Sequence, residues 1–543
     1  MCSSAGFRYL PERTACHPNA MEIVMRESLP RRREFLRQVG QGMVAAGLGQ
    51  SLRTVSAADE IPTTQRLRFP KQDRLVDLLQ ETAVSDFLPA VIRQLQTGTT
   101  LKELVSAAAL ANARAFGGED YVGFHTFMAF APSLRLSGLL TGQQSALPVL
   151  KVLYRQAAQL EAIDHHHADT LHAVPQQSTS PASPATQHRE TILAAVHAQN
   201  RESGDQTLAA AARTSPELSL NSLLPAVFEA PEVHRIVLVQ RAWDMLELVG
   251  REHADTMLRQ SLHYCVKLEP HRNGSSMNVA ADVFEQIATV SELPAPRSAA
   301  AISDQWIRQF AYLLLSSGPT TAVQAAADAL LEGVPAAAIS EAVSVAANQL
   351  LLRDPGRPEQ WAQPNKPAGS VHGDSIGVHA SDTAHAWKQI VQVSEPDNSH
   401  AAVILSALCV ARDAGIRFSA LRSQQSVAEY AATINEQQPE TLLGMLEDCV
   451  RGQQQSEATA VTAQYLQLGH DPQQVFRRLL SYACSEDGAL HGEKYYCTAH
   501  DEFSRIRPEF RNGELLALAR VTASEYGTPA PGYAEALELI KSL

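Results

Sequence analysis

Residues 371–387 read VHGDSIGVHASDTAHAW, and this stretch decides the expected fold because a shorter version occurs in the other half of the chain. Residues 121–130 read YVGFHTFMAF. Each stretch carries a Gly-x-His triplet ahead of a helical pattern, ending at His125 in the first and at His379 in the second. Self-similarity of this kind indicates an internal repeat. The pairing predicts a duplicated helical protein that brings together histidines from two halves.

The rest of the chain also has helical periodicity. Residues 101–116 (LKELVSAAALANARAF) are rich in Ala and Leu, which favour helices. Gly117 and Gly118 follow, as is typical of a helix end. No series of segments alternates apolar and polar residues with the period of two that strands require. The sequence therefore predicts an all-α fold.

Further segments extend the internal match. Residues 258–264 (LRQSLHY) resemble residues 476–482 (FRRLLSY), which aligns Tyr264 with Tyr482. A histidine follows each segment, His271 in the first half and His491 in the second. The predicted organisation is a signal region at 1–57, a first helical half in two parts at 58–172 and 191–296, a Pro/Ser/Thr/Gln-rich linker at 173–190, and a second helical half at 297–543.

Composition excludes some classes of function. The 543 residues are 45% hydrophobic and carry a formal net charge of −13. No cluster of Lys and Arg occurs beyond the N-terminus, so we expect no nucleic-acid partner. Beyond the leader, no run approaches the roughly 18 apolar residues of a spanning helix. We therefore expect no integral membrane segment in the mature chain.

The N-terminus resembles a twin-arginine export signal. Arg32 and Arg33 form the pair, an apolar Gly-rich stretch follows at 39–48, and residues 55–57 (VSA) fit a cleavage site. Pro30 departs from the usual pattern. The leader is also long, which suggests Met21 or Met25 as the true start. The sequence predicts recognition by the twin-arginine translocase and export to the periplasm, with the mature chain beginning near Ala58.

The chain contains seven cysteines, two of them in the leader. An odd number at wide spacing is not a disulfide framework, and no C-x-x-C motif is present. Cys484 and Cys497 are the one close pair, and a bridge between them stays open at this stage.

Histidines are the main candidates for chemistry. If the halves pack about a pseudo-twofold axis, equivalent residues meet near that axis. The cofactor-binding residues predicted in this way are His125, His379, His271 and His491. Neutral imidazoles around a buried centre suit a transition metal such as Fe, Zn or Mn, or haem iron. The predicted metal ligands are His125, His379, His372, Asp382 and His491.

Each of these residues also has a simpler interpretation. A lone histidine on an apolar helix face is usually a hydrogen-bonded core residue, and polar residues near His379 suit a capped helix start. A second cluster with Asp487, His491, Glu493, His500 and Asp501 fits either a metal or proton-transfer site or a surface loop. The His-rich run at 164–172 is interpreted as a solvated or adventitious metal site because it adjoins the linker.

One family resemblance rests on His125 with its helix and on residues 376–380 (IGVHA) with Trp387. These segments resemble the questin oxidase-like family of α-helical oxygenases, over about a third of the mature chain. The resemblance implies an α-helical oxidase-like scaffold and carries no substrate or residue roles. The export signal departs from what we expect of that family.

Two classes of function remain open from the sequence. The first is an exported oxidoreductase that binds a metal or haem, and a small-molecule ligand, between its halves. The second is a non-enzymatic, exported helical-repeat protein that binds or scaffolds a partner, with structural histidines. No H-E-x-x-H, Walker, G-x-S-x-G or Rossmann motif supports another class of enzyme.

Overall fold

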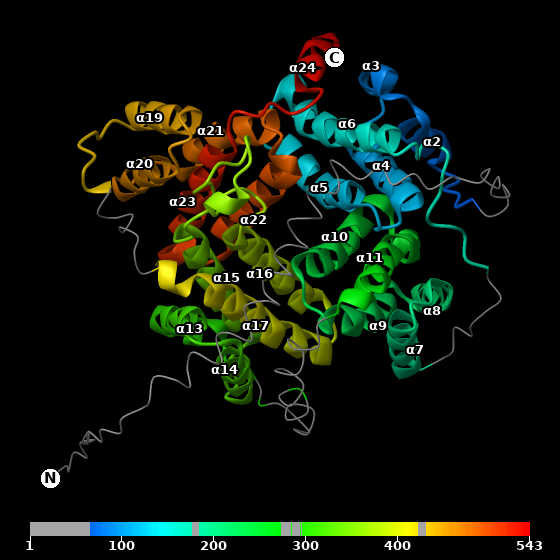
Figure 1. Ribbon diagram of the computed structural model, residues 1–543, viewed down its shortest axis with the longest axis horizontal. Helices are drawn as coiled ribbons and strands as arrows, with labels where there is room; N and C mark the ends of the chain where they lie inside the picture. Colours follow the sequence, from blue (N-terminus) through cyan, green and yellow to red (C-terminus); the bar gives the residue numbers. More distant parts are fainter. Residues whose placement is uncertain (1–65, 176–183, 273–283, 285–293, 295, 422–430) are drawn as a thin grey trace. The chain divides into compact units, whose positions relative to one another are not determined.

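The computed structural model describes residues 66–175, 184–272, 284, 294, 296–421 and 431–543 (Figure 1). Within these ranges the regular structure is helical, and extended pairing is limited to isolated bridges such as Arg66 with His172. The all-α prediction is confirmed. The predicted export signal lies outside the described residues. Residues 61–543 form one compact unit, so the predicted halves are not separate domains.

The first half contains ten α-helices among its described residues. They are α2 Asp73–Glu81, α3 Val84–Gln96, α4 Leu101–Phe116, α5 Tyr121–Ser137, α6 Leu147–Ala162, α7 Ala185–His197, α8 Arg201–Thr214, α9 Pro216–Phe228, α10 Val233–Val249 and α11 Ala254–Leu268. Helix α7 begins inside the stretch predicted as a linker, so the described part of that linker is shorter than expected.

The second half contains helices of similar length. They are α13 Asp304–Ser316, α14 Pro319–Leu331, α15 Ala336–Leu352, α16 Ile376–Val393, α17 Pro396–Leu421, α19 Pro439–Arg451, α20 Gln455–Gln467, α21 Pro472–Ser485, α22 His491–Arg505 and α23 Pro508–Glu525, followed by α24 Tyr533–Leu539. A long ordered loop between α15 and α16 contains the short 3₁₀ helix Glu359–Trp361.

Helix packing in the two halves follows the same order. Helices α4, α5 and α6 pack on one another, as do α15, α16 and α17, and α10 packs on α11 as α22 packs on α23. Helices α5, α10, α16 and α22 meet in the middle of the molecule (Figure 1). Tyr264 lies in α11 and Tyr482 in α21, which occupy different places in this order. The predicted alignment of these two tyrosines therefore does not follow this order of packing.

The turn from α4 to α5 fits tightly against α11. Gly117 ends α4 in the left-handed conformation, as its sequence position predicts. Gly118 also has a positive φ of 78°, and a Cβ atom there would overlap the carbonyl group of Gln260. Glycine at this position therefore lets α11 approach the start of α5.

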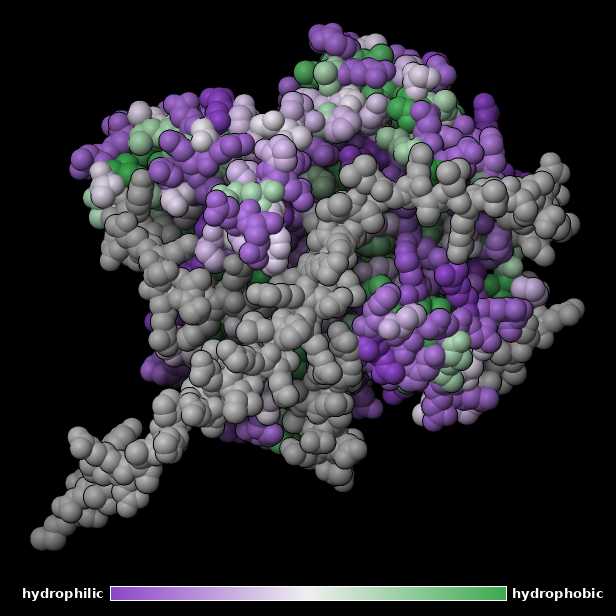
Figure 2. Space-filling model, viewed as in Figure 1, coloured by the Kyte–Doolittle hydropathy of each residue, from purple (hydrophilic) through white to green (hydrophobic). Residues whose placement is uncertain are grey.

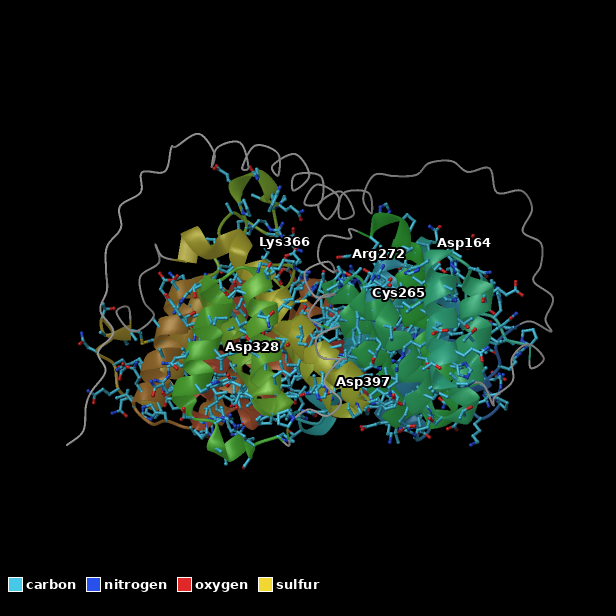
Figure 3. All side chains as sticks on the ribbon, turned by 90° about the horizontal axis from the view of Figure 1, so that it is seen from below. Asp164, Cys265, Arg272, Asp328, Lys366 and Asp397 are labelled. Atoms are coloured by element: carbon cyan, nitrogen blue, oxygen red, sulfur yellow. The ribbon has the colours of Figure 1, made fainter. Side chains whose placement is uncertain are left out.

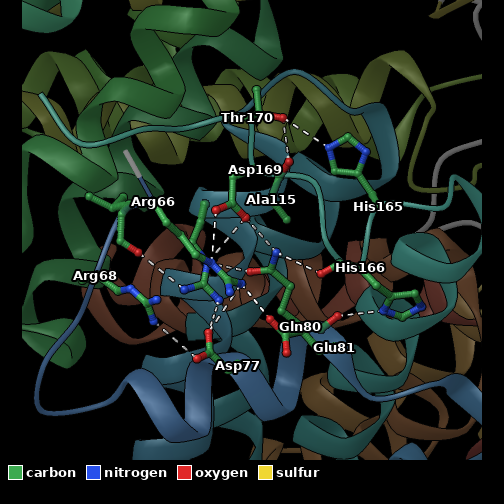
Figure 4. Close-up of polar contacts among 12 residues, drawn as sticks. Arg66, Arg68, Asp77, Gln80, Glu81, Ala115, His165, His166, Asp169 and Thr170 are labelled. Carbon is green, nitrogen blue, oxygen red and sulfur yellow. Dashed lines mark hydrogen bonds and ion pairs between the residues drawn. The ribbon is translucent and has the colours of Figure 1, made fainter. Parts of the chain in front are cut away.

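A buried ionic network holds the first described residues against the core (Figure 4). Arg114 is fully buried and donates to Asp77 at 2.7 Å, while Arg66 pairs with Asp169 at 3.2 Å. His166 joins the network through its Nδ1 atom, which lies 2.8 Å from the carbonyl oxygen of Gln80. The His-rich run beside the linker is therefore partly built into this network, although Asp164 and His167 within it are exposed.

The described surface facing the viewer in Figure 2 is mostly hydrophilic, in keeping with the charged composition. Among the described helices, none has both the length and the apolar character needed to cross a bilayer. The cysteines at 265, 409, 449, 484 and 497 are free and buried, so Cys484 and Cys497 form no bridge.

Candidate functional site

Four histidine side chains meet where α5, α10, α16 and α22 come together. The ring centroids of His125 and His234 lie 4.9 Å apart, and those of His125 and His491 lie 5.5 Å apart. His379 closes the set, at 5.8 Å from His234 and 6.0 Å from His491. Each half of the chain contributes two of these residues. We call this set the histidine cluster.

Each histidine of the cluster lies in the first turns of its helix, so four helix N-termini converge on the site. Asp120 caps α5 by accepting from the Gly123 N–H at 2.7 Å, and Glu232 caps α10. Ser375 caps α16 by accepting from the Val378 N–H at 3.3 Å. The N-terminus of a helix carries a partial positive charge, which disfavours protonation of nearby imidazoles.

Helix α22 starts differently. Ala489 and Leu490, directly before His491, both have positive φ values, 50° and 63°. Non-glycine residues rarely adopt this conformation, and consecutive examples cluster at functional sites where the surrounding structure enforces them. The loop before α16 packs against this start, because a Cβ atom on Gly373 would overlap the side chain of His491.

Hydrogen bonds fix the orientation of three of the four rings. The Nδ1 atom of His125 lies 2.8 Å from the carbonyl oxygen of Tyr121, and that of His491 lies 3.2 Å from the carbonyl oxygen of Gly488. A carbonyl oxygen only accepts, so both Nδ1 atoms donate and both Nε2 atoms keep a free lone pair. The Nε2 atom of His125 is buried without a hydrogen-bond partner.

His234 has the strongest support. Its Nδ1 atom lies 2.5 Å from the Oε1 atom of Glu232, and the hydroxyl of Tyr264 donates to the Oε2 atom of the same carboxylate at 3.2 Å. Burial alone would raise the pKa of Glu232, but the charge and hydrogen bond of His234 lower it to about 2. A carboxylate behind an imidazole is the support that metal-binding histidines usually have.

Burial favours the neutral form of His125, His379 and His491. It lowers the pKa of His379 to about 4, with repulsion from His234 as a second cause. Burial and the charge of Lys494 hold the pKa values of His125 and His491 well below their usual range. Neutral imidazole is the form that binds metal ions.

Two further charged groups lie near the cluster. Burial lowers the pKa of Lys494 to about 8, although the carboxylates of Asp382 and Glu493 oppose this change. Burial would raise the pKa of Asp374, but Lys366 and Arg357 lower it to about 2. Arg357 and Lys366 pair with Asp374 at 2.5 and 3.0 Å, on the ordered loop whose Lys366 is labelled in Figure 3.

The cluster is close to solvent on one side. Tyr121 is 42% exposed, yet its ring centroid lies only 4.3 Å from that of His125. Phe124 and Tyr264 surround the same part of the cluster, with His234 lying 5.4 Å from Phe124 and 6.4 Å from Tyr264. Only the ring of Tyr121 would therefore separate His125 from a small molecule bound on the exposed side of that ring.

The donor set suits a transition metal. Two imidazoles bound to one ion through bonds of about 2.1 Å have centroids roughly 4.5–5.5 Å apart. Of the four distances between ring centroids in the cluster, 4.9 and 5.5 Å lie within this range, and 5.8 and 6.0 Å lie slightly above it. In the described part of the chain, no group of three or more His, Cys, Asp or Glu side chains could hold a metal ion as the side chains are placed. A metal could therefore bind at the histidine cluster only if its rings moved closer together.

The other histidine predicted to join the site lies elsewhere. His271 is exposed in the 3₁₀ helix Glu269–His271 that follows α11. His234 at the start of α10 occupies the place expected for it. The error came from aligning α11 with α21, whereas the order of helices pairs α10 with α22.

The two remaining predicted ligands lie beside the cluster rather than in it. Asp382, one turn along α16 from His379, accepts a hydrogen bond from the Thr498 hydroxyl at 2.8 Å. His372 is buried in the loop before α16, and its Nε2 atom has no hydrogen-bond partner. Burial and the charge of Lys366 lower the pKa of His372 to about 4.

In the second acidic cluster predicted from sequence, Glu493, His500 and Asp501 lie in α22, whereas Asp487 lies directly before the 3₁₀ helix Gly488–Leu490. Glu493 is fully buried and pairs with Lys151 at 2.5 Å. Asp501 pairs with Arg135 at 2.6 Å, and the ring of His500 stacks on that of Tyr496. These contacts give the cluster a structural role beside the histidines.

His234 was missed because it lacks the Gly-x-His pattern of His125 and His379. Its own signal is the run Pro231 to Arg235 (PEVHR), in which a helix-capping carboxylate precedes a histidine by two residues. Comparison of the chain with protein-family models, with curated proteins and with solved structures gave no match.

Proposed function

We propose that this chain is an exported, metal-dependent oxidoreductase whose ion is bound by His125, His234, His379 and His491. The single observation that supports this most strongly is the orientation of the rings. Three Nδ1 atoms are held by oxygen acceptors, which leaves the Nε2 lone pairs for an ion. A purely structural histidine would have no need of this arrangement in three helices at once.

The donor set also narrows the cofactor. Imidazole suits Fe, Cu, Ni and Zn, whereas Mn favours carboxylates, none of which belongs to the cluster. A redox-active ion would supply electron transfer to or from a bound small molecule, which favours iron over zinc. The four rings contact one another directly, so the spacing favours a single ion over a haem. The proposal agrees with the resemblance to the questin oxidase-like family, which stays a prediction.

Residues of the chain would bind the ion, balance its charge and contact the substrate. The histidines hold the ion, and the carboxylates of Glu232 and Asp374 offset the charge that four helix N-termini and an ion bring together. The aromatic side chains of Tyr121 and Phe124 would exclude water and contact an organic substrate on the solvent side.

Elemental analysis tests the proposal. We expect protein purified from the exported fraction to contain about one first-row transition ion per chain, with an absorption or paramagnetic-resonance signal that a chelator removes. A chain that stays metal-free after incubation with ferrous, cupric and zinc ions would contradict the proposal. That result would favour the non-enzymatic binding or scaffolding protein.

The carboxylate behind His234 provides a finer test. We expect Glu232→Gln to weaken metal affinity by about 10- to 100-fold, because the amide cannot hold His234 as strongly or raise its basicity. Glu229→Gln is the matched control, since Glu229 pairs with His197 outside the cluster at 2.6 Å. Competition with a metal indicator measures both variants. Equal losses in the two would assign Glu232 a structural role only.

Export has its own test. We expect replacing Arg32 and Arg33 together by Lys to leave the precursor in the cytoplasm, because the translocase recognises the arginine pair. Immunoblots of cell fractions measure the distribution, and Arg31→Lys is the control. Normal export of the double variant would contradict a twin-arginine route.

We also infer that the two halves arose by duplication. The same order of packing in α4–α6 and α15–α17 supports this, together with His125 and His379 in the paired helices α5 and α16. The pairing of His234 with His491 follows the same order. On this basis each ancestral copy contributed two ligands.

A further inference from the structure

Glu525, the last residue of α23, lies beside the backbone that holds His491. Its side chain is buried, with the residue only 6% exposed. The Oε1 atom accepts a hydrogen bond from the Gly373 N–H at 2.8 Å. The Oε2 atom faces the start of α22, because it would lie 2.9 Å from a Cβ atom added to Gly488 and 3.6 Å from one added to Gly492.

Two small cavities meet at this carboxyl group. The larger, of about 30 Å³, is lined by Asn365, Lys366, His372, Asp487, Gly488, Ala489, Glu525 and Thr528. A water molecule needs about 10–15 Å³, so this cavity holds about two. The second cavity lies on the other side of Glu525, next to Gly492 and Tyr495.

The larger cavity is polar enough to hold water. The Nε2 atom of His372 is buried without a protein partner, and a buried polar atom of this kind is normally satisfied by water. Asn365, at the outer end, is exposed, whereas His372 and Glu525 are buried. The cavity therefore leads from the surface toward the backbone beside the histidine cluster.

We propose that Glu525 is the relay carboxyl of a water-filled proton path between the surface at Asn365 and the histidine cluster. The proposal rests on the proposed function, because chemistry at the cluster is what would consume or release protons. A proton passes from bulk water through the cavity waters to the Glu525 carboxylate. The reaction at the cluster takes up the proton on the side of Gly373, which donates to Glu525 and packs against His491, and Glu525 returns to its carboxylate form.

The charges around Glu525 agree with this role. Burial raises its pKa to about 7, although the Gly373 N–H and the charges of Lys151 and Lys366 oppose the change. A group with a pKa near neutral can both take up and release a proton at neutral pH. The other titratable groups around Glu525 are Tyr482, Glu486, Asp487, Glu493, Tyr495 and His372.

Infrared spectroscopy of the full mature chain tests the relay group. We expect a protonated-carboxyl band that titrates near neutral pH, shifts in D₂O and is absent from Glu525→Gln. The band of Glu514 is the internal control, since burial holds the pKa of that residue well above its usual range and its band persists at neutral pH. A neutral-pH band that survives in Glu525→Gln, or no such band in the wild type, would overturn the assignment.

A pair of variants at the cavity tests the path and leaves Glu525 in place. Thr528→Leu fills the cavity, while Thr528→Val keeps its volume. We expect deuterium exchange of the Glu525 carboxyl to slow on the order of tenfold in Thr528→Leu, because exchange then requires local opening of the structure. The exchange rate should be unchanged in Thr528→Val. Equal rates in the two variants would contradict the proposed proton path. Both experiments give a result in metal-free protein. A chain that binds no metal would therefore contradict the proposed function without deciding whether Glu525 relays protons.

Discussion

Replacing His379 by alanine is expected to reduce metal content from about one ion per chain to near zero. Loss of one imidazole from a four-histidine site removes one metal–nitrogen bond and a packing contact of the other three rings. Residues that only hydrogen-bond to metal ligands already contribute about 10- to 100-fold in metal affinity, so loss of a ligand should cost more. We therefore expect a loss of at least about a hundredfold. Elemental analysis after dialysis, with titration of a metal indicator, measures the change.

The chain contains a matched control for this experiment. His271→Ala makes the same chemical change at an exposed histidine outside the cluster, so metal content should stay as in the wild type. Circular dichroism of both variants separates loss of the ion from loss of the helices. Full metal content in His379→Ala would contradict the ligand set, and loss in His271→Ala would place the metal elsewhere.

The fold class was predictable because helical periodicity and end signals are local. Gly117 ends α4 and Ser375 begins α16 through hydrogen bonds within a few residues of sequence. None of these predictions needed the tertiary arrangement.

The site was predicted only in part. His125, His379 and His491 were identified, but the fourth member depends on which helices are equivalent. Short Ala/Leu-rich matches aligned α11 with α21, and that register placed His271 where His234 lies. His234 and Glu232 are two residues apart, so their contact can be predicted from the sequence. His234 and His379 lie in different halves of the chain, so their contact cannot. Only the packing of α10 against α16 provides that information.

The supporting groups of the cluster differ between the halves. In the first half, Glu232 and Tyr264 place a carboxylate and a phenol behind His234. In the second half, His491 has a backbone carbonyl in that position and Lys494 nearby. Helix order alone would predict a symmetric site. The difference between these groups gives the cluster a negative end and a positive end, so its two sides can bind and release protons differently.

Acid should destabilise the metal-free protein through the cluster. His379 has a folded-state pKa of about 4, below its unfolded value of about 6.5. The unfolded chain therefore binds the proton first, so this contribution to stability is complete above pH 6.5 and is lost as pH falls toward 4. By linkage, His379 alone accounts for about 2 kcal/mol of the free energy of unfolding lost between pH 7 and pH 5. His125 and His491 act in the same direction.

A difference between two proteins isolates this effect. His379→Asn removes the titrating ring, so we expect the chelator-treated variant to lose about 2 kcal/mol less than the wild type between pH 7 and pH 5 in urea unfolding. Glu525, whose raised pKa acts in the opposite direction, is common to both proteins and cancels in the comparison. Identical pH dependence in the two would mean that the His379 ring is solvated in the folded protein. The ion-loaded wild type should lose more stability than the metal-free protein, since protons and metal compete for the same Nε2 lone pairs.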